Sequence, residues 1–106
     1  MRILEFNVNK QRLNKELTCD FSGLVAGSVG YLHAKFHFSG NEWNEYSTKI
    51  ARFWLGDEEY AQTLDENNSC VIPPEVLTGR KFEVSVLGAA PGKLETNRIA
   101  VRQGVC

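Results

Sequence analysis

The sequence contains no long apolar run and no apolar leader, and both absences bear on where the protein acts. No stretch approaches the ~20 consecutive apolar residues that a membrane-spanning helix needs. The opening segment, residues 1–6, lacks the long apolar core of a secretory signal peptide. We therefore expect a protein that is made in, and at first resides in, a cytoplasm and does not insert into a membrane.

The sequence lacks a large excess of either positive or negative charge. The chain has twelve basic and thirteen acidic residues, so its formal net charge is −1, and the two signs are interspersed along it. A nucleic-acid-binding domain usually carries a basic stripe and a high pI, because phosphate contacts supply much of its affinity. The sequence therefore predicts neither a nucleic acid nor an anionic membrane surface as a partner.

Cysteine is scarce and irregularly spaced. Cys19, Cys70 and Cys106 are an odd number and form no CxxC pair. Disulfide frameworks use even numbers of cysteines, and zinc sites use closely spaced pairs. We expect three reduced thiols that hold neither a metal ion nor a cofactor.

What the chain does contain is period-two alternation of apolar and polar residues, which is typical of β-strands with one buried face. The clearest example is 31–38, where the apolar positions are Leu32, Ala34, Phe36 and Phe38. Shorter or less regular segments of the same kind cover residues 4–8, 48–55, 58–64, 70–72, 82–86 and 99–101.

These segments predict one all-β domain spanning 1–106. We expect an immunoglobulin-like two-sheet antiparallel β-sandwich of about seven to eight strands, with a small barrel as the alternative. Parallel pairing is not expected, because no helix long enough for a crossover connection is apparent. Residues 10–29 fit no single element, since the spacing of Leu13 and Leu17 suits either a helix turn or one face of a strand.

Groups that could do chemistry are present but are not arranged for it. His33 and His37 are four residues apart on a strand, which separates them by about 13 Å, too far to share a metal ion. Ser85 lies between valines with no base nearby in the sequence, and the acidic clusters at 57–59 and 65–66 fall at turns. A calcium ion at these turns is a minority alternative, since the EF-hand spacing is missing. The sequence therefore predicts no catalytic, cofactor-binding or metal-binding residues, and no enzyme.

The outer face of the strand at 48–55 offers the best candidates for binding. If Phe53 points inward, its neighbours of opposite parity point outward. Those outward residues are Ile50, Arg52 and Trp54. This mixture is common at the hot spots of protein interfaces, although it could also stack on sugar rings. The other interpretation is that residues 10–29 or a neighbouring loop cover Trp54.

Two further aromatic residues bear on these alternatives. Trp43 lies in a polar loop, and we expect it to fold back and close one end of the sandwich, because so large an apolar side chain is seldom left exposed. A carbohydrate-binding module that recognises cell-surface glycans would use Trp54, Trp43 and Tyr60 as stacking platforms. This is the alternative function.

Several segments carry a resemblance to a known kind of domain. They are LEFNVNKQRL at 4–13, FHFS at 36–39 with Trp43 shortly after, ARF at 51–53, CVIPPEVL at 70–77, FEVSV at 82–86 and TN at 96–97. Together they resemble the small N-terminal domains of tail and baseplate proteins in phages of Gram-positive bacteria, and are similar to the upper-baseplate protein N-terminal domain.

The resemblance implies a structural module of the virion, located in a phage or prophage tail. Such a module attaches a peripheral tail component to the baseplate, so its partners are other tail proteins and it could also be a homo-oligomer. Contact would come from edge-strand pairing or from face-to-face packing, with affinity multiplied by symmetric assembly. Members of this kind usually carry a further C-terminal region, which this sequence does not contain.

Overall fold

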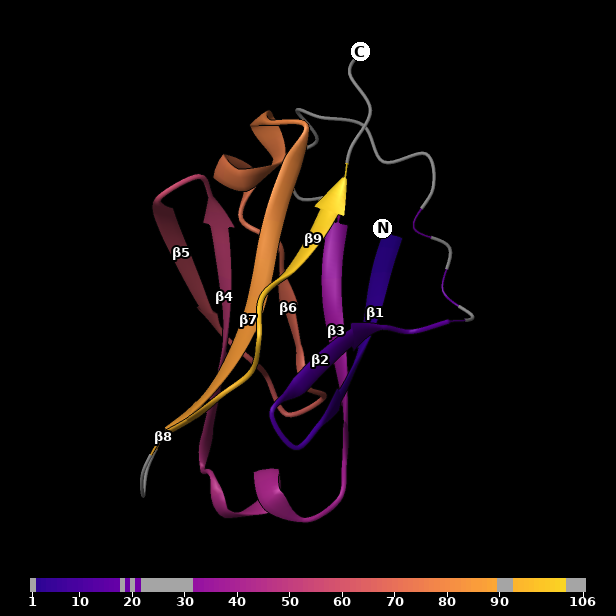
Figure 1. Ribbon diagram of the computed structural model, residues 1–106, viewed down its shortest axis with the longest axis vertical. Coiled ribbons are helices and arrows are strands. Elements are labelled where there is room, and N and C mark those ends of the chain that lie inside the picture. Colours follow the sequence, from indigo (N-terminus) through magenta and orange to yellow (C-terminus); the bar gives the residue numbers. More distant parts are fainter. Residues whose placement is uncertain (1, 18, 20, 22–31, 90–92, 103–106) are drawn as a thin grey trace.

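The computed structural model shows two β-sheets that enclose one hydrophobic core (Figure 1). It describes residues 2–17, 19, 21, 32–89 and 93–102. The strands are β1 (Arg2–Asn9), β2 (Arg12–Lys15), β3 (Leu32–Ser39), β4 (Thr48–Leu55), β5 (Glu58–Thr63), β6 (Ser69–Val71), β7 (Lys81–Ala89), β8 (Lys93–Glu95) and β9 (Ile99–Arg102), and the two 3-10 helices are η1 (Glu42–Glu45) and η2 (Pro74–Thr78). The predicted all-β two-sheet sandwich is therefore confirmed, and the barrel alternative is not.

The first sheet has the strand order β2-β1-β3-β6, and its central pair corrects one prediction. β1 and β3 run parallel, from Arg2 opposite Leu32 to Asn9 opposite Ser39, so the expectation of purely antiparallel pairing is wrong here. The chain begins its return as a strand rather than a helix, because β2 pairs antiparallel with β1 from Asn9 back to Phe6. β3 then starts beside the beginning of β1 and runs in the same direction.

The second sheet has the order β5-β4-β7, and β8 and β9 share the position beyond β7. Leu94 lies opposite Gly88, and Val101 lies opposite Phe82. The stretch from Leu94 to Val101 therefore contains one more residue than the stretch of β7 that faces it, from Gly88 to Phe82. One extra residue on one strand is a β-bulge, which bends the strand and interrupts its ladder. The nine strands of the described residues therefore fill eight positions, close to the predicted number.

Residues of one parity form the core between the sheets, as the alternation predicts. Leu32, Ala34 and Phe36 are at most 2% exposed, and Ala51 and Phe53 are fully buried. β1, β2, β7 and β9 contribute in the same way, through Leu4, Phe6, Val8, Leu13, Phe82, Val84, Val86 and Val101. Each strand contributes alternate side chains because successive side chains of a strand point to opposite faces.

Trp43 closes one end of the sandwich, as expected. It lies in η1, is only 1% exposed, and its indole Nε1 donates a hydrogen bond to the carbonyl of Lys10 at 2.7 Å. A Cβ atom at Gly88 would come within 3.0 Å of the Trp43 ring and 2.9 Å of Tyr46. Glycine at this place in β7 therefore makes room for the ring to pack against the strand.

The segment 10–29, which the sequence left unassigned, is described only in part. Its first half supplies β2, in which Leu13 is fully buried, whereas Leu17 is 95% exposed. Residues 22–29 and Cys106 lie outside the described residues. None of the helices in the described ranges is long and apolar enough to cross a membrane.

Candidate interaction surface

The predicted binding residues lie together on the outer face of the second sheet. Ile50, Arg52 and Trp54 occupy alternate positions of β4, and each is half-buried. The buried residues Ala51 and Phe53 lie between them and face the core. Strand parity therefore placed all three residues on the correct face, and their role in binding stays a prediction.

Arg52 is held by two carboxylates, one from the adjacent strand β5 and one from β8, which lies beyond β7 on the other side of β4. Its guanidinium pairs with Glu59 of β5 through two nitrogens, one of them at 3.0 Å, and with Glu95 of β8 through a third. The hydrogen bond that Arg52 donates to Glu59 is the main reason that the pKa of Arg52 is raised, and the same bond lowers the pKa of Glu59. Arg52 is therefore a fixed cation, with 21% of its side chain exposed.

Trp54 is partly covered by two guanidinium groups. The guanidinium carbon of Arg98 lies 3.6 Å from the centroid of the indole ring, and that of Arg52 lies 4.7 Å from it. Guanidinium groups are attracted to the face of an indole by its quadrupole. Arg98 belongs to the connection between β8 and β9, so a neighbouring loop does contribute to covering Trp54.

Ser85 lies beneath this stack and departs from the alternation of β7. Parity turns its side chain outward, yet it is 0% exposed, whereas an exposed serine would be expected at this position of an outer face. The indole Nε1 of Trp54 donates to Ser85 Oγ at 3.4 Å, and Ser85 Oγ donates to Glu95 at the same distance. The large side chains of Arg52 and Trp54, on the neighbouring strand, explain why this small one is covered.

Three further residues contact Arg52 and Trp54 on this outer face, and the sequence analysis did not identify them. Glu59, Glu95 and Arg98 are brought to Arg52 and Trp54 by the pairing of β4 with β5 and β7 and of β7 with β8. Only Glu59 carried a usable signal. A two-residue turn joins β4 to β5, so a hairpin register would have placed it opposite Trp54.

The two other aromatic residues of the glycan alternative are not on this face. Trp43 is buried in the end of the sandwich. Tyr60 packs against the core, and its hydroxyl donates to Glu58 at 2.6 Å, a contact that raises the pKa of the phenol. Trp54 is therefore the only one of the three on the outer face.

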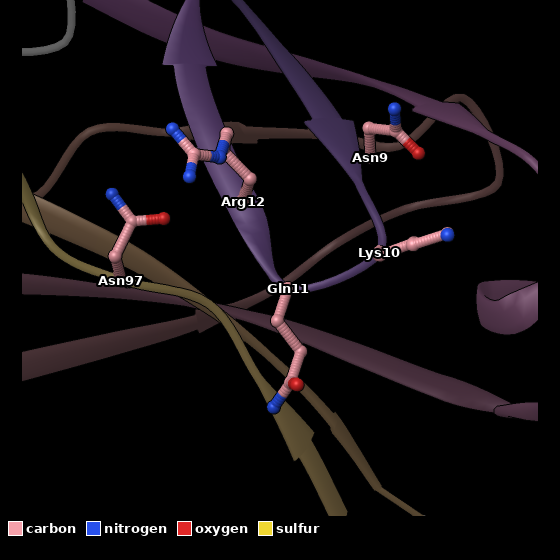
Figure 2. A pocket seen from close by; sticks show the side chains of 5 residues that line it. All are labelled: Asn9, Lys10, Gln11, Arg12 and Asn97. Carbon is pink, nitrogen blue, oxygen red and sulfur yellow. The ribbon is translucent and has the colours of Figure 1, made fainter.

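A polar hollow of about 600 Å³ lies beside the turn between β1 and β2 (Figure 2). It is lined by Asn9, Lys10, Gln11, Arg12 and Asn97. In Figure 2 the side chains of Lys10 and Gln11 leave the turn in different directions, while Arg12 and Asn97 extend toward each other. The two cations, Lys10 and Arg12, therefore do not point at a common ligand position.

Two of the residues around the hollow join the sheets instead. The side-chain amide of Asn97 accepts a hydrogen bond from the Leu13 amide at 2.8 Å and donates one to the Leu13 carbonyl at 3.4 Å. The backbone N–H of Asn97 donates to the backbone carbonyl of Gln11, and the side-chain amide of Gln11 donates to the backbone carbonyl of Glu95. The hollow therefore marks the seam between β2 and the connection from β8 to β9.

The titratable groups considered for metal binding or catalysis lie apart from one another. His33 is half-buried and His37 is exposed, with its Nε2 atom 2.7 Å from a carboxylate oxygen of Glu5. Burial raises the pKa of Cys70 to about 12, so this thiol stays protonated at neutral pH. Within residues 2–17, 19, 21, 32–89 and 93–102, no three histidine, cysteine or acidic side chains gather as ligands for a metal ion.

No protein-family model matches the sequence, and no curated protein does. The resemblance to baseplate domains therefore stays a prediction from the sequence segments quoted above.

Proposed function

We propose that the protein is a non-enzymatic structural module of a phage or prophage tail that acts through protein–protein contacts. The observation that supports protein–protein contact is the stack of Arg52, Trp54 and Arg98 on the outer face of the second sheet, and the tail assignment depends on the sequence resemblance. Tryptophan and arginine dominate the hot spots of protein interfaces. The half-buried apolar residues Ile50 and Leu87 lie opposite each other on the same face and extend this surface.

The stack is held in place before any partner binds. Arg52 is fixed by Glu59 and Glu95, and Arg98 Nη1 lies 3.8 Å from a carboxylate oxygen of Glu83. A surface whose side chains are already ordered loses less conformational entropy on association. The arrangement therefore favours a rigid docking face for another folded protein.

The same contacts favour a protein partner over a glycan. A sugar ring stacks on an open aromatic face, and here the Arg98 guanidinium lies 3.6 Å from the indole centroid. Stacking on that face would require displacement of Arg98. A protein partner can instead pack around the existing stack and pair with the carboxylates beside it.

The test is binding of the purified chain to the purified tail proteins of the phage or prophage that encodes it, measured by biolayer interferometry. We expect one tail protein to bind. The substitutions Trp54→Ala and Arg52→Ala should each weaken binding by at least about tenfold, the loss of a hot-spot residue. Circular dichroism must first show that both variants are folded.

The matched control is Lys35→Ala. Lys35 is also half-buried and basic, but it lies on the outer face of β3 in the other sheet, so this variant should bind as the wild type does. If no tail protein binds, or if Lys35→Ala and Trp54→Ala weaken binding equally, the proposal fails. Binding to a glycan array that disappears in Trp54→Ala would instead support the carbohydrate-binding alternative.

A further inference from the structure

The pairing of β5 with β4 shows which residues of β5 direct their backbone N–H and carbonyl groups toward β4 and which direct them outward. Lys49 and Leu64 are opposite each other in the register, and the amide of Leu64 donates to the carbonyl of Lys49 at 2.8 Å. Hydrogen-bonded and non-hydrogen-bonded pairs alternate along an antiparallel ladder. The backbone groups of Glu59, Ala61 and Thr63 therefore point away from β4.

No described strand lies beyond β5 to receive these groups. β5 is the end of its sheet and forms the outer border of the molecule in Figure 1. Five of its six residues are exposed, and Tyr60 is the exception. The strand therefore offers three N–H groups and three carbonyls, regularly spaced along an open edge.

The other sheet edges have fewer unpaired backbone groups in a continuous row. On β2 the outward groups of Leu13 are bound by Asn97. β6 has three residues, and the edge formed by β8 and β9 is interrupted by a bulge. Among the described strands, β5 is therefore the longest continuous edge whose backbone groups are unpaired.

The sequence of β5 is complementary to itself in one antiparallel register. When Ala61 faces Ala61 of a second copy, Glu59 faces Thr63, and all three outward residues exchange hydrogen bonds. On the other face Tyr60 then lies opposite Gln62. Within β5 no like charges are opposite, whereas a register centred on Glu59 would place two carboxylates together, which is destabilising.

The two acidic residues of β5 do not prevent this pairing. Acidic and basic side chains on an edge strand usually discourage association. Here the carboxylate of Glu59 is paired with Arg52 of its own sheet, and Glu58 accepts a hydrogen bond from Tyr60. Both charges are therefore engaged within the molecule.

We infer that β5 is a self-association edge, which pairs antiparallel with β5 of a second copy about a two-fold axis at Ala61. The result is an isologous dimer whose second sheet continues from one protomer into the other. The contact is one strand wide and smaller than a standard interface, so the dimer forms at high micromolar concentration or above, on the order of 10⁻⁴ M. This inference does not depend on the proposed tail function.

The test is sedimentation equilibrium of the full chain from low micromolar to millimolar concentration. The wild type should pass from monomer toward dimer mass. Ala61→Pro removes an outward N–H that β4 does not use, and both copies lose it, so dimerisation should weaken by about tenfold or more. Ala61→Ser keeps the N–H and a small side chain, and should dimerise as the wild type does.

Two outcomes would overturn the inference: a wild-type monomer throughout the concentration range, or dimerisation of Ala61→Pro that is as strong as that of the wild type. Because Ala61→Pro could disturb the fold, its thermal melt is recorded, and Thr63→Pro serves as the second variant since its N–H also points outward. A folded Ala61→Pro variant that no longer dimerises but still binds the tail partner would separate this edge from the docking face of Arg52 and Trp54.

Discussion

The strands β2 and β5 each end a sheet, yet their outward backbone groups meet different surroundings. On β2 the side-chain amide of Asn97 takes the place of a neighbouring strand and binds both the N–H and the carbonyl of Leu13. On β5 the equivalent groups of Glu59, Ala61 and Thr63 meet no described strand. The comparison shows that one edge is closed at Leu13 by a single side chain from the connection between β8 and β9, while the other edge stays open for association.

The closed edge depends on residues distant in sequence. Asn97 and Leu13 are separated by 84 positions, and Trp43 reaches the β1–β2 turn from a separate loop. The open edge depends on local structure, because β5 is joined to β4 by a two-residue turn. Substitutions at the closed edge should therefore affect global stability, and substitutions at the outward positions of β5 should affect association.

The largest effect on the closed edge is expected from Trp43→Ala. This change leaves a cavity at the end of the sandwich and leaves the Lys10 carbonyl without the indole donor. The free energy of unfolding, measured by urea denaturation, should fall by about 3–5 kcal/mol. Trp43→Phe keeps much of the packing and should lose less. Equal losses for the two variants would contradict this role for the indole.

Proline substitutions along β5 should alternate in their effect. Gln62→Pro removes an N–H that bonds to β4 and should lower the free energy of unfolding by about 2–3 kcal/mol. Ala61→Pro removes an outward N–H and should lower it by less than about 1 kcal/mol. Thermal denaturation of the two variants measures the difference. The assigned hydrogen-bonding phase is wrong if Ala61→Pro is the more damaging change.

Removing the side chain that closes the β2 edge should have a moderate effect. Asn97→Ala leaves the N–H and carbonyl of Leu13 to water, so the free energy of unfolding should fall by about 1–2 kcal/mol. Hydrogen exchange of the Leu13 amide should accelerate at the same time. Asn14→Ala is the control, because Asn14 is exposed on the same strand. Unchanged exchange at Leu13 would show that Asn97 does not close the edge.

The smallest effect is expected from Glu59→Gln on the open edge. Glu59 is one-third exposed, so its pair with Arg52 should contribute only about 0.2–1 kcal/mol at neutral pH. Because Arg52 lowers the pKa of Glu59, the folded state binds this proton less readily than the unfolded state, whose pKa is near 4.5. The contribution is present above that pH and is lost as pH falls through the folded-state pKa. The stability difference between wild type and variant should therefore shrink in acid, and a constant difference would contradict the pairing.

The sequence predicts the strands and their inward faces well, because a period of two in hydrophobicity follows directly from strand geometry. It fails for the β1–β3 pair, which is parallel where only antiparallel pairing was expected. It also fails at Ser85, whose burial is caused by Trp54 and Arg52 on the neighbouring strand. Both failures concern pairing between strands, which parity within one strand does not specify.

The candidate surface shows the same division. Parity places Ile50, Arg52 and Trp54 on one face, since all three belong to β4. The contacts with Glu95 and Arg98 arise only when β7 brings β8 and the following connection alongside. No local signal in the sequence marks these two residues as part of the surface.

The most direct test of the open edge is hydrogen exchange of the β5 amides, followed by NMR at two protein concentrations. In dilute solution the amides of Glu58, Tyr60 and Gln62 should be protected, and those of Glu59, Ala61 and Thr63 should exchange freely. In concentrated solution the second set should gain protection. Strong protection of Ala61 in the dilute monomer, or free exchange of Ala61 at high concentration, would contradict the account.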